Sequence, residues 1–234
     1  MESVIVKKVK HSKEKGIYGN YFKFVRFLLR TFTKEYSTSV AKSAEPKVYV
    51  CRHLNMHGAI TTLKTFNFEV RPLMLGNFFS FKGAFNHFFN YTFTKRYKLP
   101  KFLAFLPSII LALLTVPLTK SVGAIPVYRN STKAFITLKQ TVKYLLNGES
   151  VIIFADKDYK NCSKTEKGEL YSGFLYLERL YKNKTGKSIT FAPIVIDDEK
   201  LLVTELNGVT FLGKSDFKSE LTSVKNQLEN ELYS

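Results

Sequence analysis

The stretch KVYVCRHLNMHG, from Lys47 to Gly58, sets an apolar strand directly before a histidine. Residues 48–51 are β-branched, aromatic or small and apolar, a composition that favours a buried strand. The polar run that follows ends at Gly58, and residues 59–68 are typical of a helix. An imidazole at the exit of a buried strand is held rigidly at the edge of a sheet, where it can serve as a general base. We therefore predict that His53 is the chemical centre of this protein.

The composition indicates one folded unit with an anionic partner. The 234 residues fit one α/β domain, or one domain with an appended arm, and 45% hydrophobic residues suffice for a core. Thirty-six Lys and Arg residues against 19 Asp and Glu give a net charge of +17, which favours a polyanion or an anionic surface. The sequence carries none of the usual nucleic-acid-binding signatures, whereas its 21 Phe and 13 Tyr lie mostly beside long apolar runs. We therefore expect an anionic membrane surface, and no nucleic acid, as the partner.

Cysteine usage and the N-terminus favour a cytoplasmic location. Cys51 and Cys162 are too few for a disulfide framework and suit a reducing compartment. The N-terminus is charged and lacks the early apolar stretch of a signal peptide. We therefore expect a cytoplasmic protein that binds peripherally to the cytoplasmic face of a membrane.

The first candidate for membrane contact is residues 21–36, YFKFVRFLLRTFTKEY. On a helix, four of its cations fall within a stripe of roughly 80°, and Phe and Leu side chains occupy most of the remaining surface. An in-plane membrane helix needs this combination, because apolar burial and attraction to anionic lipid act together. The alternative is a surface helix that packs on the core with solvated charges. We assign residues 1–46 to a basic arm with this amphipathic helix, and residues 47–234 to an α/β domain. The four cations are Lys23, Arg26, Arg30 and Lys34.

The second candidate is residues 102–118, FLAFLPSIILALLTVPL, the most hydrophobic segment. It has 17 residues and contains Pro107 and Pro117, whereas a spanning helix needs roughly 20 apolar residues. We therefore predict a buried helix or an interfacial insertion rather than a crossing. Residues 81–97 precede it as an aromatic-rich helix, in which we expect His87 to be packed rather than catalytic.

The rest of the chain alternates strands and helices. This rhythm predicts an α/β fold with a mixed central sheet flanked by helices, after the N-terminal amphipathic helix. Pro72 indicates an edge strand or an irregular start, and Asn207-Gly208 predicts the turn of a hairpin over residues 201–212. The expected strands are residues 70–76, 123–128, 150–155 and 188–196, and the expected helices are 131–146, capped by Ser131, 171–181 and 214–232.

Three of the predicted strands end in polar residues: His53, Arg129 and Asp156. Ligands collect at the carboxyl ends of strands in open α/β sheets. A histidine can take a proton, an arginine can bind a phosphate bidentately, and a carboxylate can assist the histidine. This set of groups suits transfer of a group onto the hydroxyl of a phosphorylated acceptor.

The order of these motifs resembles that of the 1-acylglycerol-3-phosphate O-acyltransferase (lysophospholipid acyltransferase) family. The resemblance covers residues 48–196 and rests on four blocks. His53 stands in the place of the histidine of a His-x-x-x-x-Asp block, and Gly123–Arg129, GAIPVYR, follows the pattern Gly-x-Ile-x-x-x-Arg. Phe154–Lys157, FADK, stands in the place of Phe-Pro-Glu-Gly, and Phe191–Ile194, FAPI, is an apolar strand with an internal proline.

The resemblance implies a glycerolipid acyltransferase-like fold and an O-acyltransferase of phospholipid biosynthesis. His53, with Asp156, would remove a proton from the hydroxyl of a lysophospholipid such as 1-acylglycerol-3-phosphate. That oxygen would attack the thioester of acyl-CoA or acyl-carrier protein. No metal and no further cofactor is implied, and apolar surface from residues 81–118 would accommodate acyl chains. The implied substrate-binding residues are Arg129 and Lys157 on the phosphate, with Asn55, His57, Gly58 and Phe154 around them.

The chain departs from the family pattern at several of these positions. Gly58 replaces the aspartate that orients the histidine, and Ala155, Asp156 and Lys157 replace Pro, Glu and Gly. Asp156, Asp158 or His57 could take over the orienting role, or the chain could be a divergent branch with a different acceptor. A third account keeps the fold and the membrane binding without the chemistry, which makes a non-catalytic peripheral lipid-binding protein the alternative function. His53 and His57 have the spacing of a zinc pair on a helix, but no further His or paired Cys lies close in sequence, so we predict no metal.

Overall fold

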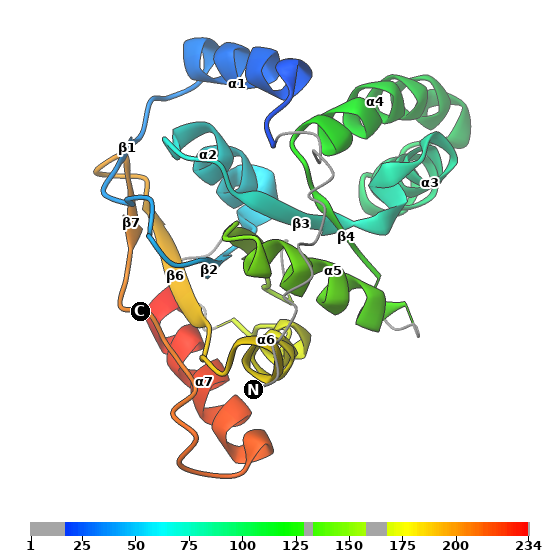
Figure 1. Ribbon diagram of the computed structural model, residues 1–234. Helices are drawn as coiled ribbons and strands as arrows, with labels where there is room; N and C mark the ends of the chain where they lie inside the picture. Colours follow the sequence, from blue (N-terminus) through cyan, green and yellow to red (C-terminus); the bar gives the residue numbers. More distant parts are fainter. Residues whose placement is uncertain (1–16, 129–132, 158–167, 234) are drawn as a thin grey trace, which may run out of the picture.

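The computed structural model describes residues 17–128, 133–157 and 168–233. They form an α/β structure around a seven-stranded sheet of order β1-β7-β6-β2-β5-β3-β4, which is mixed because β6 and β7 are antiparallel and the other neighbours are parallel (Figure 1). The predicted α/β class with a mixed central sheet is confirmed. The strands are β1 (Ser37–Thr38), β2 (Lys47–Cys51), β3 (Arg71–Leu75), β4 (Ile125–Val127), β5 (Val151–Phe154), β6 (Thr190–Asp197) and β7 (Leu202–Glu205).

Helices cover both faces of the sheet. Alternate residues of β2 point to opposite faces, so Val48 and Val50 pack with residues of α5, α6 and α7, whereas Tyr49 and Cys51 pack with residues that end and follow α2. The helices are α1 (Asn20–Phe32), α2 (His57–Thr65), α3 (Phe81–Asn86), α4 (Lys101–Ser121), α5 (Ala134–Leu146), α6 (Leu177–Thr185) and α7 (Phe217–Tyr233), the π-helix η3 (His87–Arg96), and the short 3₁₀ helices η1 (Leu54–Met56), η2 (Gly76–Phe79) and η4 (Gly173–Tyr176).

The hairpin prediction is wrong, and of the two alternatives for Pro72 the edge strand is excluded. The hairpin does not turn at Asn207-Gly208: β6 and β7 pair antiparallel from Asp197 and Leu202 onward, so the chain turns at residues 198–201. Beyond β7, Val209 makes only an isolated bridge to Phe191. Pro72 does not mark an edge, because β3 lies between β5 and β4 and pairs with β5 through its first two residues and with β4 through its last three.

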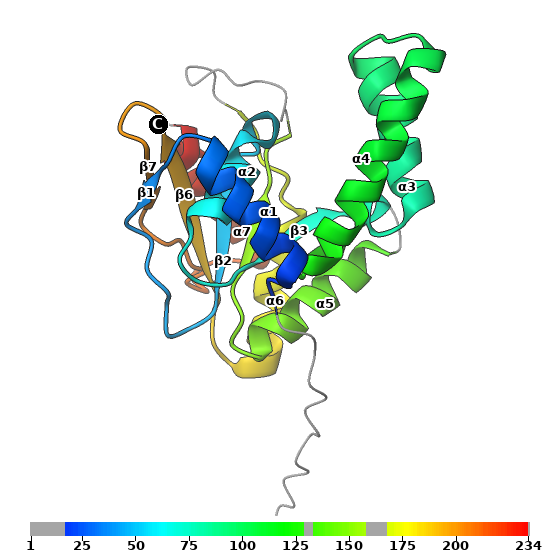
Figure 2. The same cartoon turned by 90° about the horizontal axis from the view of Figure 1, so that it is seen from above.

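Residues 76–121 form a helical arm that projects from the body of the protein (Figure 2). Its second half, α4, is continuous through Pro107 and Pro117. Only 22% of its most apolar stretch is buried, which excludes the buried helix, whereas the interfacial insertion stays a prediction. Among the described residues, α4 is the one helix that is long and apolar enough to cross a membrane. His87 packs against Phe78 and Tyr91 in the arm, and burial lowers its pKa.

The side chains of α4 are arranged with the small ones inward. Its buried positions include Ala104, Ser108 and Ala112, which recur every four residues and let α3 and η3 approach closely. Its large side chains point outward, and Phe102 is 77% exposed. A helix of a soluble core shows the opposite arrangement. The exposed large residues of α4 are Phe102, Leu103, Phe105, Leu106, Ile110, Leu113 and Leu114.

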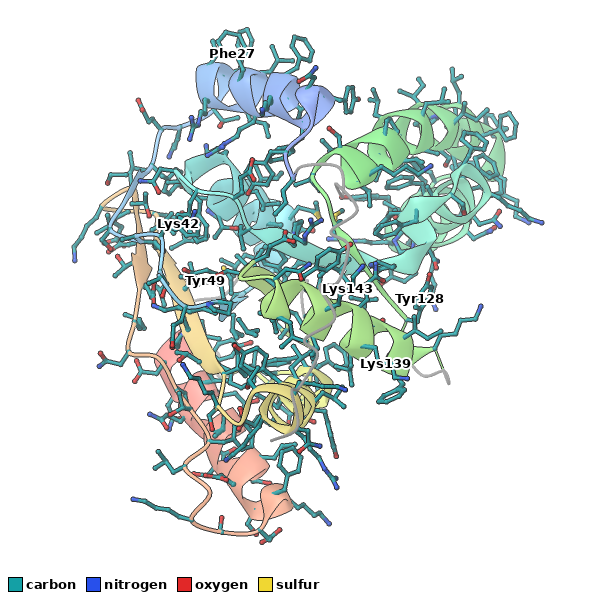
Figure 3. All side chains as sticks on the ribbon, in the orientation of Figure 1. Phe27, Lys42, Tyr49, Tyr128, Lys139 and Lys143 are labelled. Carbon is teal, nitrogen blue, oxygen red and sulfur yellow. The ribbon has the colours of Figure 1, made fainter. Side chains whose placement is uncertain are left out.

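The N-terminal helix α1 is docked through the buried Phe22 at its start and through two arginines farther along, whereas Phe24, Phe27 and Phe32 are exposed. Arg26 Nε and Arg30 Nε donate to the carbonyl oxygen of Lys64 at 3.1 and 2.7 Å, at the carboxyl end of α2, where the helix dipole favours cations. Phe27 points away from the body and is 64% exposed (Figure 3). Arg26 and Arg30, two of the four cations predicted to form a basic stripe, thus donate hydrogen bonds to the body of the protein. In the alternative prediction these charges would be solvated. At its other end, α1 is bonded to α4, since the amide of Phe22 donates to Ser121 Oγ at 2.9 Å.

Candidate functional site

Three adjacent parallel strands bring polar residues to one edge of the sheet. In the order β6, β2, β5, these strands are followed by Asp198, His53 and Asp156, respectively. The carboxyl ends of parallel strands meet at the same edge. The rule that led from strand exits to His53 and Asp156 therefore holds for these two residues, and Asp198 joins them as a second acidic residue.

Asp156 contacts His53 through the backbone. The amide N–H of His53 donates to Asp156 Oδ1 at 2.6 Å, and the Asp156 side chain is buried, with 4% exposed. A short bond from an amide to a carboxylate is among the stronger hydrogen bonds in proteins. The ring of Phe154, at the end of β5, meets the imidazole edge-on with 6.0 Å between centroids. Asp156 therefore fixes the position of the chain at His53, and Phe154 packs against its ring.

The chain after His53 makes a strained left-handed turn. Leu54, Asn55 and Met56 have φ of 45°, 53° and 77°, a conformation that costs side-chain-bearing residues free energy and gathers at functional sites. The turn brings the amide N–H of Met56 to 3.0 Å from His53 Nδ1, to which it donates. A ring nitrogen that accepts a hydrogen bond is unprotonated, so neutral His53 carries its proton on Nε2.

Gly58 lies where this turn folds back on the strand. Its amide donates to the carbonyl oxygen of His53 at 3.1 Å. A Cβ added at Gly58 would stand 1.8 Å from the carbonyl oxygen of Arg52, well inside van der Waals contact. The position that the resemblance gives to an orienting aspartate therefore has no room for any side chain, and the backbone of this turn requires glycine.

His57, the first residue of α2, belongs to a second pair. Its Nε2 lies 2.8 Å from Asp198 Oδ1, and the hydroxyl of Tyr36 donates to the same oxygen at 2.8 Å. Burial, and next the bond to Asp198, raises the pKa of Tyr36 to about 12, so this hydroxyl stays protonated. The sequence prediction named His57 but missed Asp198 and Tyr36. Asp198 could have been found by the strand-exit rule, because it follows the predicted strand 188–196 within two residues.

The remaining predicted site residues are spread over other contacts. Asn55 Oδ1 accepts a hydrogen bond from Arg96 Nη2, which joins the end of η3 in the arm to the turn after His53. Lys157 forms an ion pair with Glu169, and this hydrogen bond raises the pKa of the Lys157 ammonium. Arg129 and Asp158 lie outside the described residues.

Arg52 and Tyr233 complete this edge and were missed in the sequence. The Arg52 guanidinium lies over the ring of Tyr233 with 4.4 Å to the centroid, so the last described residue of α7 reaches the exit of β2. Burial, and then the negative charge of Asp156, raises the pKa of Tyr233 to about 12. The same two causes raise the pKa of the Cys51 thiol. Cys51 is therefore an inert buried thiol rather than a nucleophile.

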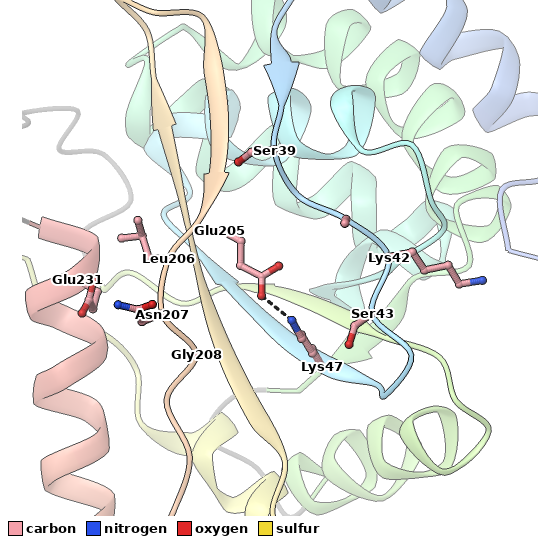
Figure 4. Close-up of a pocket in the computed structure, with 10 residues that line it drawn as sticks. Ser39, Lys42, Ser43, Lys47, Glu205, Leu206, Asn207, Gly208 and Glu231 are labelled. Atoms are coloured by element: carbon pink, nitrogen blue, oxygen red, sulfur yellow. Dashed lines mark hydrogen bonds and ion pairs between the residues drawn. The ribbon is translucent and has the colours of Figure 1, made fainter.

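A surface pocket away from the two histidines is lined by an ion pair and small polar residues. Its lining includes Lys47 at the start of β2 and Glu205 at the end of β7, which form an ion pair of 2.6 Å across it (Figure 4). Ser43 and Asn207 also line it, and none of the predicted site residues does. It lies at the opposite end of β2 from His53 and is not the predicted site.

Two histidines and two carboxylates near one edge of the sheet provide acid–base chemistry. Within the described ranges, no group of three or more His, Cys, Asp or Glu side chains is placed to hold a metal ion. No family model, curated protein or solved structure matches this chain. A function is therefore inferred from the chemistry of this edge and of the surface beside it.

Proposed function

We propose that this protein is a membrane-bound O-acyltransferase, a divergent member of the lysophospholipid acyltransferase type. It moves a fatty acyl group from a thioester donor, acyl-CoA or acyl-carrier protein, to the hydroxyl of a lysophospholipid such as 1-acylglycerol-3-phosphate. The observation that carries this proposal is a histidine–carboxylate edge on an α/β sheet beside helices that turn large apolar side chains outward. This combination supports a substrate that is itself part of a membrane.

The chemistry needs a neutral imidazole and no metal. An imidazole removes the proton of the acceptor hydroxyl as the oxygen attacks the thioester carbonyl, and the thiol leaves. The resemblance gives this role to His53, with Arg129 as the group that binds the acceptor's phosphate. A basic chain of net charge +17 also attracts acidic acyl-carrier protein and anionic headgroups.

The exposed faces of α1 and α4 support membrane binding. Both helices lie on the same side of the protein (Figure 1), and they are bonded to each other where α4 ends. Burying one Phe or Leu side chain contributes about 1.5–3 kcal/mol, so a few of the exposed residues suffice for attachment. Lys23 and Lys101 are exposed beside these faces and suit anionic headgroups. The proposed attachment is in-plane and peripheral, on the cytoplasmic face.

A non-catalytic lipid-binding protein on the same fold is the second candidate. Two observations favour it: the position of the family aspartate is Gly58, and the Nδ1 atom of His53 is already engaged by the amide of Met56. The two candidates share the membrane surface and differ only in turnover.

Acyl transfer to a panel of lysophospholipids separates the candidates. Labelled acyl-CoA and, separately, acyl-carrier protein are the donors, and wild type is compared with His53→Ala. We expect transfer by wild type and a loss of at least about 100-fold in the variant, because a positioned acid–base or hydrogen-bonding group is worth that much. Vesicle binding by His53→Ala should equal that of wild type, since His53 lies on neither α1 nor α4.

Two results would contradict the proposal in different ways. A folded, vesicle-binding wild type that transfers no acyl group to any acceptor would favour the non-catalytic candidate. Full activity of His53→Ala would mean that His53 takes no part in the reaction.

A further inference from the structure

We infer that His57, oriented by Asp198, is the general base of the proposed acyl transfer, and that His53 beside it serves as a hydrogen-bond donor. This inference rests on the proposed function. It changes the residue to which the base is assigned, and it accounts for the glycine at position 58.

His53 is held in the wrong protonation state for a base. Its Nδ1 accepts from the amide of Met56 at 3.0 Å, so its proton sits on Nε2. To accept a proton at Nε2, the imidazole would have to shift its own proton to Nδ1 and break this bond. The bond closes the left-handed turn of residues 54–56, whose φ values are all positive. In this conformation His53 donates a hydrogen bond and does not take a proton.

His57 has the arrangement that His53 lacks. Its Nε2 lies 2.8 Å from Asp198 Oδ1, and an ionised carboxylate only accepts, so the proton of neutral His57 sits on Nε2. Its lone pair is then on Nδ1, and within the described part of the chain no hydrogen bond engages that atom. The His57 side chain is 39% exposed, so a substrate hydroxyl can reach it. In general-base catalysis by histidine, a carboxylate accepts a hydrogen bond from one ring nitrogen and the other ring nitrogen takes the proton. Here Nε2 and Nδ1 of His57 have these two roles.

Asp198 is itself held in place by Tyr36. The Tyr36 hydroxyl donates to the oxygen that His57 contacts, and the Tyr36 ring meets the imidazole edge-on with 6.0 Å between centroids. On its other side, Lys64 Nζ lies 5.2 Å from the centroid of the same ring. Tyr36 is buried, so its ring is fixed by packing beside the pair of His57 and Asp198. Asp198 and Tyr36 are positioning residues, and the orienting carboxylate comes here from the residue that follows β6 rather than from position 58.

The step that follows balances without any further reactant. His57 Nδ1 takes the proton of the acceptor hydroxyl while the oxygen forms a bond to the thioester carbonyl carbon. The tetrahedral intermediate collapses, the carbon–sulfur bond breaks, and the imidazolium returns the proton to the departing sulfur. The products are an ester and a free thiol, and His57 regains its starting state.

Crossed glutamine substitutions test the assignment. The amide nitrogen of glutamine can replace histidine Nε2 as a donor, but glutamine takes no proton at neutral pH. His57→Gln can still donate to Asp198, and we expect it to lose at least about 100-fold in acyl transfer because the base is gone. His53→Gln keeps a donor, and we expect it to retain activity within about tenfold of wild type, unlike His53→Ala.

The outcomes distinguish this inference from the proposed function. An active wild type with a larger loss in His53→Gln than in His57→Gln, or with equal losses, overturns the inference and leaves the acyltransferase proposal standing. A wild type without acyl transfer overturns both.

Nitrogen-15 NMR of the imidazole rings tests the geometry without relying on turnover. We expect both histidines to show an unprotonated Nδ1 and a protonated Nε2 at a pH where they are neutral. Asp198→Asn should change the tautomer ratio of His57 and leave that of His53 unchanged, whereas a merely structural carboxylate would alter neither. A wild-type His57 with its proton on Nδ1 would overturn the inference.

Discussion

Gly58→Ala is expected to lower the free energy of unfolding by at least about 3 kcal/mol. The added Cβ would stand 1.8 Å from the Arg52 carbonyl oxygen, a backbone atom that cannot rotate away as a side chain could. Relief requires the turn of residues 54–56 to open, which breaks the bond from Met56 to His53 Nδ1. In a domain of this size, such a loss corresponds to a fall in Tm of about 6–12 °C.

Denaturant unfolding of matched glycine variants measures this effect. Gly173→Ala is the control, because a Cβ there meets no atom within 4 Å; we expect it to be neutral or to stabilise by less than about 1 kcal/mol. Gly58→Asp, which restores the family residue, should destabilise at least as much as Gly58→Ala. If Gly58→Asp were as stable as wild type, the left-handed turn would not be the native conformation.

Phe27→Glu is expected to weaken binding to anionic vesicles by about 10- to 100-fold. The substitution removes an apolar side chain worth about 1.5–3 kcal/mol when buried, and each 1.4 kcal/mol is a factor of ten in affinity. Leu106→Glu on α4 should have a similar effect, because its side chain is also exposed on the proposed membrane face. Neither change should alter stability, since neither side chain contributes to the core of the free protein.

The control for vesicle binding is Phe135→Glu on α5. Phe135 is 49% exposed, but α5 lies away from α1 and α4 (Figure 1). Co-sedimentation with vesicles of mixed neutral and anionic lipid gives the affinities, and thermal unfolding checks the fold. Equal losses for Phe27→Glu and Phe135→Glu would show that binding follows net charge rather than a defined face, and would contradict the proposed docking surface.

The helical arm of residues 76–121 and the helix α1, which form the proposed membrane-binding surface, are both joined to the candidate site. Arg96, at the end of η3, donates to Asn55 in the turn that follows His53. Tyr36, which holds Asp198, lies four residues beyond the end of α1. The two elements that expose apolar side chains are therefore each tied to the residues around the two histidines.

Local patterns in the sequence were enough to predict the class of fold and two residues of the candidate site, His53 and Asp156. Runs of apolar residues such as 48–51 and 151–154 mark buried strands, because a strand covered on both faces is apolar throughout. The rule that strand exits collect functional groups then led to His53 and Asp156, which the structure brings into contact. The same rule applied to residues 197–198 would have included Asp198.

Contacts between distant residues decided the rest. Asn207-Gly208 is a strong local turn signal, but it does not form the hairpin turn. The strand β7 pairs with the preceding strand β6 instead of with residues 209–212, so the turn lies at residues 198–201. The sequence shows that α4 is apolar. Its packing against α3 and η3 decided which side chains of α4 point inward and which are exposed. His57 and Asp198 are 141 residues apart, and no spacing rule links them. By itself the sequence determined the central strands β2, β3, β4, β5 and β6, the apolar helices and the residues at the strand exits, because short-range sterics and hydrophobicity act locally. Only the tertiary structure decided which carboxylate meets which imidazole nitrogen, because that depends on strand order and on the few ångströms of backbone around Gly58.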